Sequence, residues 1–134
     1  MAIRPGGRGD VSETHVLWRS QRGIPYVPSP VLVGNHYYLV DDQGIVTCLD
    51  AFSGKLIWQN RLGGAFTASP VAGDGKVYFT NDDGETIVVK GDEKTFVELA
   101  RNSLGEPVYA SGAISQGCIF YRTQRGLVCV GATR

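Results

Sequence analysis

The stretch at residues 49–58 reads Leu-Asp-Ala-Phe-Ser-Gly-Lys-Leu-Ile-Trp and decides the fold. Asp50 and Ser53 have short polar side chains that can hydrogen-bond to nearby backbone. Gly54 readily adopts the positive φ that a turn between antiparallel strands needs. The apolar residues 56–58 then begin a second strand. The stretch therefore predicts two strands joined by a tight turn.

Units of this kind recur about every forty residues. Ser29-Pro30-Val31 returns as Ser69-Pro70-Val71, and Ser111-Gly112-Ala113 follows in turn. Each copy continues through a turn, a strand rich in aromatic and β-branched residues, a second turn and a third strand. Two copies add a fourth strand, at residues 56–61 and about 96–101. The second turn carries a glycine fifteen residues after the repeated serine in every copy: Gly44, Gly84 and Gly126.

Four strands per repeat of about forty residues are typical of a β-propeller blade. No helical periodicity of useful length appears, so the fold class is predicted to be all-β, with blades of four antiparallel strands. One further strand, at 15–22, precedes the first copy, and Trp18 stands eleven residues before Ser29 as Trp58 stands before Ser69. The segment thus contains strands for three blades.

The expected organisation is a flexible N-terminal arm at residues 1–14 and a propeller segment at residues 15–134. Within the segment we expect an orphan outer strand at 15–22 and repeats at about 29–68, 69–110 and 111–131. The orphan strand is expected to complete the last blade, either in cis or from a partner chain.

Three blades are too few for a closed ring, because propellers typically hold about four to eight. One hypothesis is a head-to-tail homodimer that makes six blades. The alternative is that the chain is a piece of a longer propeller. An open arc would leave apolar blade faces and a strand edge exposed, which favours association.

Composition excludes several classes of function. The net charge is zero, so no strong field favours nucleic acid. No run of 18 apolar residues is present, so we expect no membrane span. The polar, glycine-rich start lacks the apolar segment of a signal peptide, which indicates either a cytoplasmic protein or a missing upstream segment. The three cysteines, Cys48, Cys118 and Cys129, lack metal-site spacing and are interpreted as small buried hydrophobes.

Residues 48–58 resemble the tryptophan-docking motif of quinoprotein-type propellers, Ala-x-Asp-x-x-x-Gly-x-x-x-Trp. Asp50, Gly54 and Trp58 match it, and Cys48 replaces the usual alanine. The full motif occurs once, whereas only Trp18 of it is recognisable before the first copy. The resemblance implies a structural role in blade docking for Trp18, Asp50, Gly54 and Trp58. It also implies that relatives are often exported, although the compartment of this chain stays unknown.

The same resemblance raises the possibility of pyrroloquinoline quinone and calcium as cofactors. Quinoprotein dehydrogenases hold them with adjacent cysteines or an aromatic stack, a calcium cage and a basic contact. The sequence has no adjacent cysteine pair and no calcium-loop spacing. We therefore expect no cofactor, no metal and no catalytic residue, and an enzyme is the less favoured reading.

Two sets of side chains are candidates for contact with a ligand. Tyr26, Phe66 and Tyr109 precede the repeated serines, where loops of a propeller line one mouth of the central channel. They are candidate channel-mouth ligand contacts, and packing between blades is the alternative. The pairs Asp41-Asp42 and Asp82-Asp83 are interpreted as turn residues rather than a metal rim.

The sequence thus predicts a non-catalytic scaffold or binding module that recognises a protein or carbohydrate partner and assembles into a closed ring. The alternative is a C-terminal fragment of a pyrroloquinoline-quinone-dependent oxidoreductase.

Overall fold

The computed structural model describes residues 1–21 and 23–131. Residue 22, the last of the expected 15–22 strand, and residues 132–134, the end of the expected 15–134 segment, lie outside the described residues. The described part of the chain is built from antiparallel strands and has no helix. It accordingly contains no helix long and apolar enough to cross a membrane.

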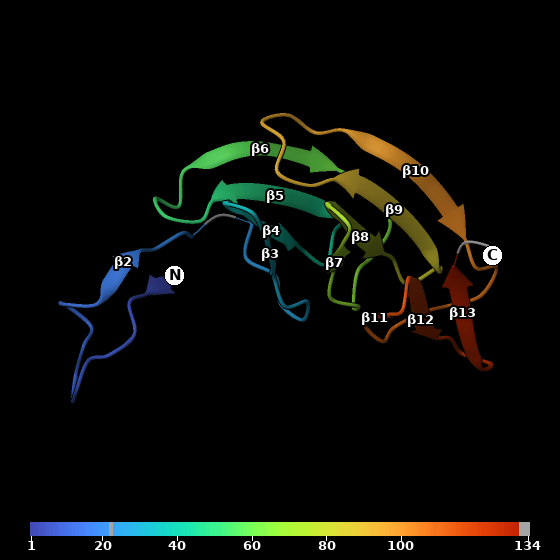
Figure 1. The fold of residues 1–134 in the computed structure, drawn as a ribbon, viewed down its shortest axis with the longest axis horizontal. Coiled ribbons are helices and arrows are strands. Elements are labelled where there is room, and N and C mark those ends of the chain that lie inside the picture. Colours follow the sequence, from blue (N-terminus) through green and yellow to red (C-terminus); the bar gives the residue numbers. More distant parts are fainter. Residues whose placement is uncertain (22, 132–134) are drawn as a thin grey trace.

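Three sheets follow one another along the chain as an open arc (Figure 1), and we call them blades 1, 2 and 3. Blade 1 consists of β3 (Val31–Val33), β4 (His36–Val40), β5 (Ile45–Asp50) and β6 (Leu56–Arg61). Blade 2 consists of β7 (Val71–Gly73), β8 (Lys76–Thr80), β9 (Glu85–Lys90) and β10 (Glu98–Ser103). Blade 3 consists of β11 (Ala113–Ser115), β12 (Cys118–Arg122) and β13 (Leu127–Gly131). The predicted all-β propeller fold with antiparallel blades is confirmed, and blades 1 and 2 have the four strands expected.

Turn chemistry sets the boundaries of these strands. Gly44 and Gly84 have φ of 77° and 81°, which a side chain with a Cβ rarely adopts. In the same turns Asp41 accepts a hydrogen bond from the backbone N–H of Ile45, and Asn81 accepts one from Glu85. The Asp41 carboxylate therefore stabilises a hairpin turn, as the sequence predicted.

Blades 1 and 2 share one apolar core, because every second side chain of their strands points toward the other blade. Tyr38, Val40, Val46 and Cys48 of blade 1 face blade 2, and all four side chains are buried. Val77, Phe79, Ile87 and Val89 of blade 2 belong to the same cluster. Successive residues of a strand point to opposite faces of its sheet, so the remaining positions of each blade face the other neighbour. Each blade thus has a leading face, toward the N-terminal end of the arc, and a trailing face, toward its C-terminal end.

An unexpected hairpin precedes blade 1. Strand β1 (Ala2–Ile3) pairs antiparallel with β2 (Val16–Trp18), so the range expected to be a flexible arm at 1–14 contains a strand. The hairpin lies at the end of the arc opposite β13 (Figure 1). Blade 3 consequently has three strands among the described residues, and β2 does not complete it in cis. Completion by a partner chain is the alternative that stays open.

Candidate functional site

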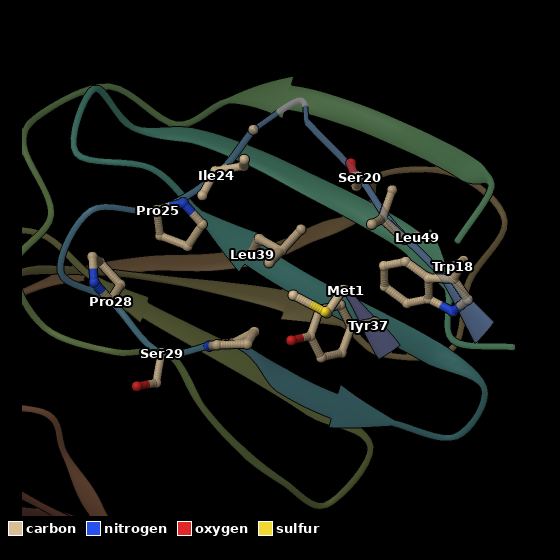
Figure 2. A pocket seen from close by; sticks show the side chains of 12 residues that line it. Met1, Trp18, Ser20, Ile24, Pro25, Pro28, Ser29, Tyr37, Leu39 and Leu49 are labelled. Carbon is tan, nitrogen blue, oxygen red and sulfur yellow. The ribbon is translucent and has the colours of Figure 1, made fainter. Parts of the chain in front are cut away.

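The first candidate site is a pocket of about 290 Å³ between the β1–β2 hairpin and the leading face of blade 1 (Figure 2). We call it the hairpin pocket. Its walls are mostly apolar and come from three places: the hairpin, the segment before β3, and strands β4 and β5. The lining residues include Met1, Trp18, Pro25, Tyr37, Leu39 and Leu49.

Trp18 fastens the hairpin to blade 1 at one edge of this pocket. Its indole N–H donates to the carbonyl oxygen of Ala51 at 2.9 Å. Its ring lies against the turn at Gly54, where an added Cβ would come within 2.5 Å of the ring. The ring also makes an edge contact with Tyr37, with centroids 6.0 Å apart. A glycine is therefore needed at position 54 both for its φ of 69° and for space.

Asp50 holds the turn that receives Trp18. Its Oδ1 accepts hydrogen bonds from the backbone N–H and the hydroxyl of Ser53, at 2.7 and 2.6 Å. These bonds lower the pKa of the Asp50 carboxyl, first through the hydroxyl and then through the backbone N–H. The charged form of Asp50 thus shapes the seat for the tryptophan of the preceding unit.

Trp58 makes the same kind of link one blade further along. Its indole N–H donates to the carbonyl oxygen of Glu93 at 3.1 Å. Its ring packs against Tyr38 and Phe96, at centroid distances of 5.8 and 5.4 Å. Each tryptophan therefore lies on the outer strand of one unit, and its side chain hydrogen-bonds to a turn of the next unit.

The repeated serines form a second link between blades. The backbone N–H of Ser29 donates to Ser69 Oγ at 2.8 Å, and that of Ser69 donates to Ser111 Oγ at 3.0 Å. We call this series the serine relay. Within the described residues, Ser29 Oγ receives no hydrogen bond and the N–H of Ser111 donates none. The relay is therefore open at both ends.

The second candidate site is the trailing face of blade 3, at the other end of the arc. Strand register places Phe120 and Cys129 opposite one another, as Tyr38 and Cys48 are in blade 1. In blade 1 these two residues are 0% exposed. In blade 3, Phe120 is partly exposed and Cys129 is exposed. Leu127, in the place of the fully buried Val46, is 71% exposed.

The three aromatic side chains predicted at the channel mouth differ in how far they are exposed. Tyr26 is 90% exposed and Tyr109 is 55% exposed, whereas Phe66 is 1% exposed and packs within the core of blades 1 and 2. Phe66 as a ligand contact is therefore wrong, because no surface of its ring is available. The alternative weighed for these residues, packing between blades, describes Phe66.

Backbone pairing also corrects the equivalence that placed Tyr109 in this group. The N–H of Asp82 donates to the carbonyl of Ala65, and the N–H of Gln124 donates to that of Pro107. The residue after Pro107, Val108, is thus the counterpart of Phe66, and it is fully buried. Val108 stands three residues before Ser111, as Phe66 stands three before Ser69, whereas Tyr109 stands two residues before Ser111. The aromatic ring at Tyr109, and not the spacing, suggested the wrong equivalence.

The described residues do not offer a calcium site of the kind that the family resemblance implies. Among them, no three His, Cys, Asp or Glu side chains come together in a possible metal site. Asp82 instead accepts hydrogen bonds from the N–H and hydroxyl of Thr67, at 2.8 and 3.1 Å. Its carboxylate holds the loop before β7 against the turn between β8 and β9.

Cysteine environments differ between the interior and the end of the arc. Burial raises the pKa of the Cys48 thiol to about 12, although a hydrogen bond with Tyr38 opposes the shift. Cys48 is therefore a protonated, inert core residue at neutral pH, as predicted. Cys129 is exposed, so the prediction that every cysteine is buried is wrong there.

Comparison with known proteins assigns the family. The sequence profile described as outer membrane protein assembly factor BamB matches residues 9–99. The chain belongs to this family. The resemblance to quinoprotein-type repeats is thereby confirmed, since solved quinoproteins share the BamB-family fold seen here. No curated protein sequence matches the chain.

Solved structures resemble this BamB-family chain in fold. BamB from Moraxella catarrhalis superimposes with a TM-score of 0.62 at 19% identity, over 76% of this chain and 32% of its own. Quinohemoprotein alcohol dehydrogenase ADHIIG from Pseudomonas putida HK5 gives 0.65 at 17% identity, over 78% and 19%. The quinohemoprotein alcohol dehydrogenase from Comamonas testosteroni gives 0.59 at 19% identity, over 71% and 16%. The chain spans about a third or less of the length of these structures.

Proposed function

We propose that this chain is a non-catalytic propeller scaffold that binds proteins, beginning with a second copy of itself. The head-to-tail pair would place the trailing face of blade 3 against the hairpin end of the other copy and close a ring of six blades. The finished ring would present its loops to a further protein partner. A carbohydrate partner is the alternative outcome for those loops.

The observation that carries this proposal is the complementarity of the two ends of the arc. The trailing face of blade 3 offers apolar side chains at positions that are fully buried in blade 1. The hairpin end offers an apolar pocket on a leading face. Within the part of the chain that the structure describes, the serine relay leaves the Ser29 Oγ acceptor and the Ser111 N–H donor without partners. Exposed apolar surface of this kind favours association.

Family membership supports a scaffold over an enzyme. The family is described as an outer membrane protein assembly factor, which is a protein-organising role. The dehydrogenases found among similar structures share less than 20% identity with this chain, and such a likeness concerns the fold. The donor set of the described residues offers no support for a calcium site.

The assembly is tested by light scattering of the purified chain over a range of concentrations. We expect a species of twice the 14.5 kDa mass of one chain, and a closed pair that does not grow further. A monodisperse monomer at every concentration would overturn the assembly. Open-ended growth with concentration would overturn the closed ring.

The non-catalytic part is tested with pyrroloquinoline quinone and calcium. Tryptophan fluorescence would report binding, and dye-linked alcohol oxidation would report turnover. We expect neither to respond. Saturable binding accompanied by turnover would replace the scaffold with an oxidoreductase.

A further inference from the structure

The β1–β2 hairpin reproduces the corner of a complete blade. The pairs Ala2↔Trp18 and Ile3↔Val16 correspond to Cys48↔Trp58 and Leu49↔Leu56, and the register shifts at the same step in both. The backbone bond from Arg4 N–H to His15 O, at 2.7 Å, corresponds to that from Asp50 N–H to Lys55 O, at 2.8 Å. Strand β2 therefore stands as the outer strand of a blade that precedes blade 1, and β1 stands as its third strand.

The third strand of a blade is also the position that β13 holds in blade 3. Strand β13 pairs with β12 as β5 pairs with β4, and its outer edge has no partner among the described residues. Strand β1 and the β13 of a second copy would thus compete to pair with the same edge of β2. Strand β1 gives that edge two paired residues, whereas β5 gives β6 five. The longer strand would form the more extensive ladder.

The hairpin pocket lies at the place where, between blades 1 and 2, apolar side chains fill the interface. Counting along the repeats, its residues Tyr37, Leu39 and Leu49 are the counterparts of Val77, Phe79 and Val89. Those three blade 2 residues belong to the same buried cluster as Tyr38. The counterpart of Tyr38 in blade 3 is Phe120.

This inference rests on the proposed head-to-tail assembly. We propose that the hairpin pocket is the socket for Phe120 of a second copy, and that β1 occupies the edge of β2 until the second copy's β13 replaces it. Met1, which lines the pocket beside Tyr37 (Figure 2), leaves together with β1. The displaced β1 is a built-in competitor that weakens association. The same docking would allow Ser111 N–H of one copy to donate to Ser29 Oγ of the other.

Two variants test the two halves of the proposal by sedimentation at several concentrations. Ile3→Pro removes a strand residue of β1, which is half exposed and outside the core, so the fold should persist. We expect it to lower the dimer Kd by about tenfold or more, because the competent edge is no longer occupied. Ile3→Val is the matched control and should leave the Kd unchanged. Deletion of residues 2–4 checks the result without introducing proline.

Phe120→Asp tests the socket. A charge in an apolar anchor position should raise the dimer Kd by more than about tenfold. Leu99→Asp is the control, because Leu99 is an exposed apolar residue on the outer strand β10, away from both ends. Equal effects of the two aspartates would overturn Phe120 as the anchor.

A disulfide cross-link tests the register itself. Gln59 and Thr47 pair directly and hydrogen-bond at 2.9 Å, and their counterparts across the proposed junction are Arg19 and Val128. Arg19→Cys with Val128→Cys, in a Cys118→Ser and Cys129→Ser background, should form a covalent dimer under glutathione disulfide. The two thiols lose two protons and two electrons, which reduce glutathione disulfide to two glutathiones. Arg8→Cys in place of Arg19→Cys is the control and should not cross-link.

The outcomes separate this inference from the assembly on which it rests. If the unmodified chain dimerises and Ile3→Pro leaves the Kd unchanged, β1 is not a competitor, while the ring stands. If neither chain dimerises at any concentration, the assembly itself is wrong. If the chain dimerises and the cross-link does not form, strand β13 does not replace β1.

Discussion

The two junctions between blades are built differently. The junction of blades 1 and 2 is apolar and contains Trp58, which spans it with a hydrogen bond to Glu93. At the junction of blades 2 and 3 the tryptophan is missing, because Ala100 holds the corresponding place opposite Val88. A cavity of about 280 Å³ lies there instead, lined by residues that include Tyr78 and Ile119.

The second junction also substitutes hydroxyl groups for apolar contacts. Thr80 and Thr86 hydrogen-bond at 2.9 Å, and Thr86 also contacts the hydroxyl of Tyr121 at 3.4 Å. The net contribution of a hydrogen bond to the free energy of unfolding is smaller than that of a buried aromatic ring. The comparison predicts that the docking tryptophan, rather than the number of strands, decides how strongly neighbouring blades are held together.

Trp58→Ala tests the strong junction and should have the largest effect. The substitution leaves a cavity among Tyr38, Phe96 and their neighbours, so the free energy of unfolding should fall by about 3–5 kcal/mol. Urea denaturation measures the change. Trp18→Ala is the matched variant: its ring is less buried, so its effect should be smaller. Equal effects would contradict the ranking of the two docking sites.

Hydrogen exchange tests whether the weak junction opens first. Backbone amides of β12 and β13 should exchange well before those of β4 and β5, because blade 3 is held on one side by a hollow junction. Mass spectrometry of peptides from both blades measures this at one pH and temperature. Equal protection would mean that the arc unfolds as one unit and that the cavity does not weaken it.

Alkaline pH should destabilise the strong junction through Cys48. The folded pKa of its thiol is raised from 9.0 to about 12, so folding favours the protonated form. The contribution is fully present below pH 9 and is lost as pH rises toward about 12. By pH 10 the loss should be about 1 kcal/mol. Burial also raises the pKa of Tyr38, which acts in the same direction.

The pH effect is isolated by comparison with Cys48→Ala. The variant removes the titrating thiol, so its stability should fall less between pH 9 and pH 10 than that of the unmodified chain. Parallel losses in the two proteins would assign the effect to other groups.

Thr86→Val tests the weak junction and should have a much smaller effect than Trp58→Ala. The change leaves the buried hydroxyl of Thr80 without its partner, at a cost of about 1–2 kcal/mol. The double variant Thr80→Val with Thr86→Val removes both hydroxyls and should recover much of that loss. Denaturation of the two single variants and the double variant completes the cycle. If the double variant were less stable than either single variant, the cost would not come from an unpaired hydroxyl. Each hydroxyl would then stabilise the junction by itself.

Much of the fold could be predicted because turn glycines and strand residues repeat at a nearly constant period. Strand β6 has the predicted bounds, whereas β10 begins two residues later than expected, because the loop before it lacks the docking motif. Strand β1 escaped prediction since ten residues separate Arg4 from His15, whereas four separate Asp50 from Lys55. The Ala2-Ile3 dipeptide is too short to signal a strand without that comparison.

The candidate sites were harder to predict because they depend on what covers each face. Phe66 and Tyr26 hold similar places before a repeated serine, yet one is in a core and the other is exposed. The difference comes from the neighbouring blade, which is present for Phe66 and incomplete for Tyr26. Sequence spacing gives a residue its place in a blade, whereas its availability follows from the adjoining blade.

The direction of the tryptophan links has a consequence for protein engineering. Each tryptophan belongs to one sheet, and its indole N–H donates to a backbone carbonyl of the following sheet. Trp18 donates to Ala51 and Trp58 donates to Glu93. A library that shuffles whole sheets would preserve every ladder and still separate each donor from its acceptor. Chimaeras with crossovers inside the sheets, which inherit the tryptophan strand and the turn that receives it from one parent, should tolerate recombination better.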